Sequence, residues 1–251
     1  RSTPVFLVHH MTGEVVGLIA ALRALGCRDL CCLFVTYAGE PPASYLDAVL
    51  DLPPDEFRAL ALVNVPTPGH VEGHYKLSTH YSQLDEAADI TKALHGRDRH
   101  YVSAMRAAAV VPFFRQLQRA ERAGQRCLLI EDGGYLAPVL DEAMLRERSC
   151  AAFAAELGHT IVDDRPLADV AMRLLHGTVE HTRNGFDRLA EVERTHGRLA
   201  LPAFSIAISK LKRLVESREI AASILSAIET VLNADGRMLS RRTPLVLGSH
   251  G

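Results

Sequence analysis

The sequence has no apolar run that approaches the ~20 residues a helix needs to cross a bilayer, which argues against a membrane protein. It also has no basic block, because charges of both signs are mixed to a formal net charge of -2. A nucleic-acid or anionic-lipid partner is therefore not expected. No internal repeat or low-complexity stretch is visible, and 48% hydrophobic residues suffice for a folded core. The expected ligands are small molecules.

Disulfide bonding also has little support in the sequence. The five cysteines are an odd number without a C-x-x-C pair, and no secretory signal is recognised. Cys31, Cys32 and Cys127 lie in apolar runs, where a free cysteine behaves as a small hydrophobe. We therefore expect a reduced, cytoplasmic protein.

Short apolar runs alternate with helical patterns along the first 156 residues. The predicted strands cover residues 5–8, 31–37, 60–65 and 127–130, and the predicted helices cover residues 14–25, 43–50 and 136–156. Apolar strands that alternate with helices are typical of an α/β fold whose mostly parallel sheet is buried on both faces. We predict a doubly wound, Rossmann-like domain with its ligands at the carboxyl ends of the strands.

Residues 66–125 interrupt this alternation and are interpreted as an insertion or a cap with two helices, over residues 85–94 and 102–124. The segment contains a metal-like cluster, formed by His70, Glu72, His74 and His80. The spacing differs from H-E-x-x-H, and nearby prolines and glycines disfavour a helix there. A solvated loop is favoured and no metal site is predicted, although a metal-dependent enzyme built on this loop stays an alternative.

The last part of the sequence predicts a change of domain. Residues 209–233 have apolar side chains at helical spacing, which predicts one connecting helix over about 209–240. Residues 243–247 predict a strand that leads into Gly248 and Gly251, as at the start of a dinucleotide-binding βαβ unit. We expect a substrate domain over 1–208 and the beginning of an NAD-binding Rossmann domain over 241–251. A start at Arg1 and an end on a glycine turn suggest a fragment of a longer protein.

Four segments occur in an order that resembles one enzyme family. The first two are Val8-His-His-Met-Thr12 and Leu129-Ile-Glu-Asp-Gly-Gly134. The third is Gly177-Thr-Val-Glu-His-Thr-Arg-Asn-Gly185, followed by Arg188-Leu189. The fourth combines Leu201-Pro-Ala203, Ser209-Lys210 and Arg218-Glu219. The ordered set resembles the S-adenosyl-L-homocysteine hydrolase (adenosylhomocysteinase) family, and we interpret the chain as a divergent, truncated member.

The resemblance implies a site, a cofactor and a substrate class. His10 and Asp132 correspond to acid/base residues of the family, in which NAD supplies the redox step. Contacts to substrate are implied for Thr12, Glu131, His181 and Lys210. Contacts to NAD are implied for Thr182, Asn184, Gly248 and Gly251. The implied substrate is a nucleoside or an S-adenosyl-type thioether, and the family packs as homo-oligomers.

Departures from the family pattern concern the same site. His181 stands where the family has a ribose-binding glutamate, Ile208 where it has its catalytic lysine, and Ser217 where it has a cysteine. Because an apolar side chain cannot relay a proton, the ordinary reaction should be impaired unless Lys210 or Lys212 replaces the lost lysine. We therefore predict a modified reaction. The alternative is a non-catalytic relative that binds NAD or a nucleoside and has a regulatory or interaction role.

Overall fold

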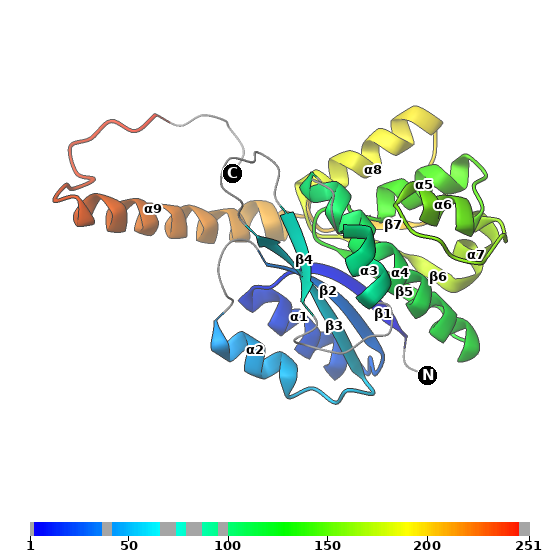
Figure 1. Ribbon diagram of the computed structural model, residues 1–251. Helices are drawn as coiled ribbons and strands as arrows, with labels where there is room; N and C mark the ends of the chain where they lie inside the picture. Colours follow the sequence, from blue (N-terminus) through cyan, green and yellow to red (C-terminus); the bar gives the residue numbers. More distant parts are fainter. Residues whose placement is uncertain (1–2, 37–41, 66–73, 79–86, 95–99, 246–251) are drawn as a thin grey trace. The chain divides into compact units, whose positions relative to one another are not determined.

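The computed structural model describes residues 3–36, 42–65, 74–78, 87–94 and 100–245 (Figure 1). The fold is built on a seven-stranded sheet in the order β4-β3-β2-β1-β5-β6-β7. Neighbouring strands are parallel, except that β4 runs antiparallel to β3. The strands are β1 (Val5–His10), β2 (Leu30–Thr36), β3 (Phe57–Val65), β4 (His74–Ser78), β5 (Cys127–Glu131), β6 (Leu175–Glu180) and β7 (Ala203–Ser205).

The chain winds in two directions from the central strand β1. It first passes through β2 and β3, with α1 (Gly13–Ala24) and α2 (Ala43–Leu50) as connections, and then returns to the other side of β1 for β5, β6 and β7. The helices after β4 are α3 (Ala87–Leu94), α4 (Tyr101–Arg122), α5 (Ala137–Leu145), α6 (Cys150–Glu156), α7 (Leu167–Leu174) and α8 (Arg183–His196). The winding direction therefore switches between β1 and β5.

Each face of the sheet has its own hydrophobic core. Along β1, Val5 and Leu7 belong to the cluster that includes α1, whereas Phe6 and Val8 belong to the cluster that includes α4. All four side chains are buried. Burial on both faces explains why the strands occur in the sequence as continuous apolar runs. The predicted α/β class with a mostly parallel sheet is confirmed.

Helix α4 differs from the expectation that residues 66–125 form an insertion or a cap. The helix contacts β1, β2 and β5, and Met105 and Phe113 are fully buried within it. Its alanine-rich middle, with Ala107 and Ala108 also fully buried, lets the helix lie close to the strands. The expected cap is therefore part of the main core. Three members of the metal-like cluster lie outside the described residues: His70, Glu72 and His80.

Helices α5 and α6 replace the single helix expected over residues 136–156. Glu147 has a left-handed φ of 55°, which ends the first helix, and the Ser149 side chain accepts a hydrogen bond from the Ala152 amide to begin the second. Strand β6 (Leu175–Glu180) has no counterpart among the strands predicted from the sequence. Its His176 and Glu180 interrupt the apolar pattern that identified the other strands.

Residues 206–251 form a second compact unit, separate from 1–205. A π-helical turn, η1 (Lys212–Glu216), leads into α9 (Ser217–Ala234). The connecting helix expected over about 209–240 is present but ends earlier, at Ala234, since Gly236 follows with a left-handed φ of 68°. The strand expected over 243–247 is absent from residues 243–245, which have no neighbouring strand among the described residues to complete their backbone hydrogen bonds. Gly248 and Gly251 lie outside the described residues. Within the described part of the chain, no helix has the length and apolar character to span a membrane.

Glycines allow the loop after β5 to approach the first turn of α8. Gly134 has a φ of 62°, and a Cβ atom on it would lie 2.6 Å from the Cα atom of Gly185. A Cβ atom on Gly185 would lie 2.0 Å from the carboxyl carbon of Glu180. Neither position has room for a side chain, so this contact holds the ends of β5 and β6 close together.

We expect Gly185→Ala to lower the free energy of unfolding by about 1–3 kcal/mol, because the added methyl group displaces the buried Glu180 carboxylate. Gly17→Ala is the matched control. No atom lies within 4 Å of a Cβ there, so alanine should stabilise α1 by roughly 0.5–1 kcal/mol. Urea unfolding of both variants measures the difference, and similar changes at the two positions would contradict the packing argument.

Candidate functional site

Polar side chains gather at the carboxyl ends of three strands, next to the switch in winding direction. His9 and His10 end β1, Asp132 follows β5, and His181 follows β6. The Asp132 amide donates a hydrogen bond of 2.9 Å to the Val8 carbonyl, which holds the ends of β1 and β5 side by side. Doubly wound folds bind their ligands at this place, because the loops diverge there and leave a crevice.

His10 and Asp132 form a hydrogen-bonded dyad. The Nδ1 atom of His10 lies 2.6 Å from Oδ2 of Asp132, and both side chains are largely buried. A carboxylate only accepts hydrogen bonds, so Nδ1 carries the hydrogen and the neutral ring has its lone pair on Nε2. This arrangement fixes the orientation of the imidazole and leaves Nε2 to exchange a proton.

Two tyrosines extend the dyad. The Tyr101 hydroxyl lies 3.4 Å from Nε2 of His10 and 3.0 Å from the Tyr135 hydroxyl. If Tyr101 donates toward the imidazole, Tyr135 donates toward Tyr101, and the four groups form one directed series that ends at Asp132. Tyr101 begins α4 and Tyr135 follows the glycine turn after β5, so the series joins three separate segments of the chain.

His9 and His181 form a second pair beside the dyad. Nδ1 of His9 donates to the His10 carbonyl over 3.0 Å and also lies 3.4 Å from Oδ2 of Asp132. Its Nε2 atom is 3.3 Å from Nδ1 of His181. Because Nδ1 of His9 is the donor, its Nε2 accepts from His181. His181 is therefore connected to the predicted acid/base pair through His9.

The charge of Asp132 is favoured by its neighbours. Burial by itself disfavours the carboxylate, but the hydrogen bond from His10, and the positive charge of His9, His10 and His181 when these rings are protonated, outweigh that cost, and the pKa of Asp132 is lowered. Asp132 therefore remains an anion that can stabilise a protonated imidazole.

Glu131 is expected to contact substrate, but it supports the fold instead. Its side chain is fully buried, and its two oxygens accept hydrogen bonds of 2.7 Å from the Leu136 and Ala137 amides. Burial raises the pKa of Glu131 to about 7, with the amides opposing the rise and the charge of Glu180 adding to it. Since both oxygens are engaged by the backbone, Glu131 holds the start of α5 and does not face a ligand.

Glu180 holds the start of α8 in a similar way. Its Oε1 atom accepts hydrogen bonds from the Gly133 amide at 3.1 Å and from the Thr182 amide and hydroxyl at 2.7 Å each. Burial raises the pKa of Glu180, against the effect of these hydrogen bonds. The two buried glutamates therefore fix the turns that carry Asp132 and His181.

Thr12 and Lys210 were both expected to contact substrate, but neither is hydrogen-bonded to His10, Asp132 or His181 among the described contacts. Thr12 precedes α1, and a hydrogen bond from its side chain is the main cause of the lowered pKa of Glu14. Lys210 is an exposed residue of the second unit, as is Ile208 at the position of the family lysine. Within the first unit, the structure brings together His10, Asp132 and His181.

The two described residues expected at NAD, Thr182 and Asn184, lie at the start of α8. The Thr182 hydroxyl donates to Glu180 and accepts from the Gly185 amide at 3.0 Å, which caps α8. Asn184 is exposed on the first turn of that helix. Thr182 therefore stabilises the start of α8, and Asn184 is part of the protein surface.

His9, Tyr101 and Tyr135 belong to the site but are absent from the sequence prediction. His9 has a signal, since it adjoins His10 in the first motif. Tyr135 likewise follows the glycines of the second motif. No sequence motif indicates Tyr101, because it reaches the site from α4 and only the packing of that helix on the sheet places it there.

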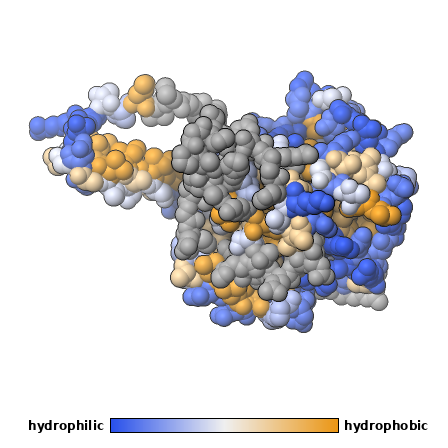
Figure 2. Space-filling model, viewed as in Figure 1, coloured by the Kyte–Doolittle hydropathy of each residue, from blue (hydrophilic) through white to orange (hydrophobic). Residues whose placement is uncertain are grey.

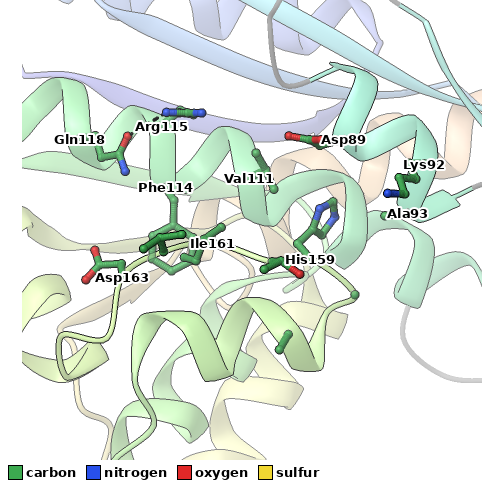
Figure 3. A pocket seen from close by; sticks show the side chains of 14 residues that line it. Asp89, Lys92, Ala93, Val111, Phe114, Arg115, Gln118, His159, Ile161 and Asp163 are labelled. Carbon is green, nitrogen blue, oxygen red and sulfur yellow. Dashed lines mark hydrogen bonds between the residues drawn. The ribbon is translucent and has the colours of Figure 1, made fainter.

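A separate cavity of about 820 Å³ lies away from these residues (Figure 3). It is lined by α3, by the outer side of α4 and by residues 158–163, with Phe114 and Ile161 on its apolar part and Lys92 and Arg115 among its charged groups. His159 is buried beside it and donates to the Ala107 carbonyl over 2.6 Å, so its ring is used within the fold. None of the dyad residues lines this cavity. Across the described residues, no group of three or more His, Cys, Asp or Glu side chains is arranged to hold a metal ion.

The raised pKa of Glu131 predicts a pH-dependent stability. Between its ordinary value of 4.5 and about 7, the folded protein holds a proton that the unfolded chain releases. The free energy of unfolding should therefore fall as the pH rises through this range, by up to ~3 kcal/mol from this group. Glu131→Gln should make the decrease between pH 4.5 and 7 shallower in chemical unfolding, whereas Glu193→Gln on the exposed side of α8 should not. An unchanged slope in Glu131→Gln would exclude this origin.

Comparisons with known proteins add no assignment. No protein-family model matches the chain, and no curated protein matches it. Among solved structures, one described as "Crystal structure of LpCGTa in complex with UDP" is 14% identical, with a TM-score of 0.26. The alignment covers 86% of this chain and 56% of that one, so this chain spans about half its length. A TM-score this low assigns neither a fold family nor a ligand.

Proposed function

We propose that the first unit, residues 1–205, binds a small molecule at the ends of β1, β5 and β6, and that His10 transfers a proton to or from it. The observation that supports this most directly is the 2.6 Å hydrogen bond between His10 Nδ1 and Asp132 Oδ2. A histidine that a carboxylate orients through one ring nitrogen can act as acid or base through the other. The resemblance to adenosylhomocysteinase selects the same two residues and implies a nucleoside or an S-adenosyl-type thioether as the ligand.

In this proposal the proton is exchanged at Nε2 of His10. The Asp132 carboxylate stabilises the imidazolium that forms when Nε2 takes up a proton, because its lowered pKa keeps it charged. The Tyr101 hydroxyl lies 3.4 Å from Nε2, which is long for a hydrogen bond of this type. A ligand atom can therefore replace it at little cost.

The neighbouring side chains provide hydrogen bonds for a polyhydroxylated ligand. Tyr101 and Tyr135 both donate and accept, and His181 supplies an imidazole where the family has a glutamate. An imidazole binds hydroxyl groups without the fixed negative charge of a carboxylate. The substitution therefore supports a modified reaction or a modified ligand.

NAD remains part of the proposal through the resemblance alone. When bound, it would supply the oxidation and reduction of the sugar, which no side chain of the first unit can perform. The Thr182 hydroxyl is engaged by Glu180 and Asn184 is exposed, so we assign no step to NAD. Denaturing the purified protein and measuring released NAD tests this part separately.

Nucleoside binding without catalysis is the second candidate function. Ile208 favours it, because an apolar side chain stands where the resembled family has its catalytic lysine. A binding protein would keep the affinity of the site and show no turnover. The two candidates therefore differ in one measurable property.

We expect His10→Ala to reduce turnover of S-adenosylhomocysteine or a related thioether by about 100- to 10,000-fold, because the acid/base group is lost. Asp132→Asn should also reduce turnover, since an amide cannot stabilise the imidazolium as a carboxylate does. Release of free thiol measures turnover, and calorimetric titration with adenosine measures binding in the same variants.

His176→Ala is the matched control, because His176 is exposed at the start of β6, away from the carboxyl ends of the strands. It should leave both measurements unchanged. Adenosine binding that weakens in His10→Ala, with no turnover in any form, would support the binding protein. Absence of binding and of turnover in the unaltered chain would refute both candidates.

A further inference from the structure

Two arginines of the first unit line a cavity that lies behind the turn after β5. The cavity has a volume of about 530 Å³ and is lined by residues of α4, α5 and α8. Arg106 comes from α4 and Arg188 from α8. Among the described residues, neither arginine forms an ion pair with a carboxylate. The cavity therefore has two positive charges that no protein anion neutralises directly.

Backbone carbonyls hold both guanidinium groups in place. Nε of Arg106 donates to the Tyr135 carbonyl over 3.1 Å. Nη1 of Arg188 donates to the carbonyls of Gly133 and Gly134 over 2.9 Å and 3.2 Å. Within the part of the chain that the structure describes, the other N–H groups of the two side chains have no acceptor. These donors are left for a ligand, and binding would cost little side-chain entropy because both groups are already fixed.

The two guanidinium groups are close enough to influence each other. Burial lowers the pKa of Arg106, and the charge of Arg188 lowers it further. The carboxylates of Glu131 and Glu142 act in the opposite direction without reversing the shift. Since arginine stays protonated in proteins, both positive charges remain. An anion bound between them would replace their repulsion by attraction.

The carboxylates of the lining have other partners. Each of the three acidic side chains that line the cavity is paired with an arginine that does not line it. The pairs are Glu142 with Arg146, Asp187 with Arg183 and Glu191 with Arg194. In the lining, Arg106 and Arg188 are therefore the charges that remain to attract a ligand.

We propose that this cavity binds the phosphate group of a small molecule between Arg106 and Arg188. A phosphate monoester carries a charge of about −1.5 to −2 at neutral pH, which matches two guanidinium groups better than a single carboxylate does. Its oxygens accept hydrogen bonds from the paired N–H groups that arginine presents in one plane. The charge and the free donors of the two side chains thus favour the same kind of ligand.

The rest of the lining accommodates an apolar organic group on that phosphate. Pro138, Val139 and Val192 supply its apolar side chains, and a volume of about 530 Å³ is within the range of small-molecule sites, ~300–1,000 Å³. Figure 2 shows mainly hydrophilic side chains where Figure 1 labels α8, which suits a charged small molecule better than an apolar protein surface. The histidines of the candidate functional site do not line this cavity, so the inference does not depend on the function proposed above.

Calorimetric titration of the full chain with phenyl phosphate tests the proposal. Phenyl phosphate should bind saturably and more tightly than inorganic phosphate, and phenol at the same concentration should not bind. Arg106→Gln and Arg188→Gln should each weaken the binding roughly 10- to 100-fold, because each removes hydrogen bonds between charged groups. An equal affinity for inorganic phosphate would identify free phosphate as the ligand. Phenol that binds as tightly as phenyl phosphate, or no saturable binding of phenyl phosphate up to ~10 mM, would overturn the proposal.

Two further variants separate this site from general effects of charge and folding. Arg126→Gln is the matched control, because Arg126 also donates to backbone carbonyls but precedes β5 and does not line the cavity. It should leave the affinity unchanged. Glu142→Gln should tighten phenyl phosphate binding about two- to fivefold, since it removes a negative charge from the lining and leaves both arginines and their hydrogen bonds in place.

Equal weakening in Arg126→Gln, or an affinity that Glu142→Gln does not raise, would refute the assignment to this cavity. Circular dichroism and thermal unfolding confirm that each variant is folded.

Discussion

The parallel pairing of β1 with β5 is the contact on which the site depends. It brings His10 and Asp132 to the same edge of the sheet although 122 residues separate them in the sequence. The register is as important as the pairing. Val8 lies opposite Glu131, whose side chain points into the fold. Successive side chains along a strand point in opposite directions, so that of the next residue, Asp132, points to the site. A slip of one residue would exchange these two carboxylates and remove the dyad.

Buried carboxylates keep that edge of the sheet in place. Glu131 and Glu180 each accept hydrogen bonds from the backbone of the turn that follows their strand, and each is held at an energetic cost that burial imposes on its charge. Gly185 packs against one of them so closely that no side chain fits. These contacts position the turns that carry Asp132 and His181 beside His9 and His10 at the end of β1.

Matches and departures from the resembled family are distributed unevenly over the two units. The predicted acid/base pair, His10 and Asp132, lies in the first unit, where the geometry supports a proton-transferring site. Most departures, including Ile208 and Ser217, lie in the second. His181 is a departure in the first unit, and it contacts the site through His9.

The sequence by itself determined the α/β class, most strands of the sheet and the pair His10 and Asp132, because continuous apolar runs and short ordered motifs are local signals. It could not determine that α4 belongs to the core, since an amphipathic helix has the same pattern in a cap as on a sheet. Glu131 was also predicted to contact the substrate, because a motif does not show which way a side chain points. Tertiary structure alone decided the partners of each side chain: Tyr101 at the imidazole, Glu131 under the turn and His9 beside His181. These contacts join strands and helices far apart in the chain, and only packing of the sheet on α4 fixes their distances.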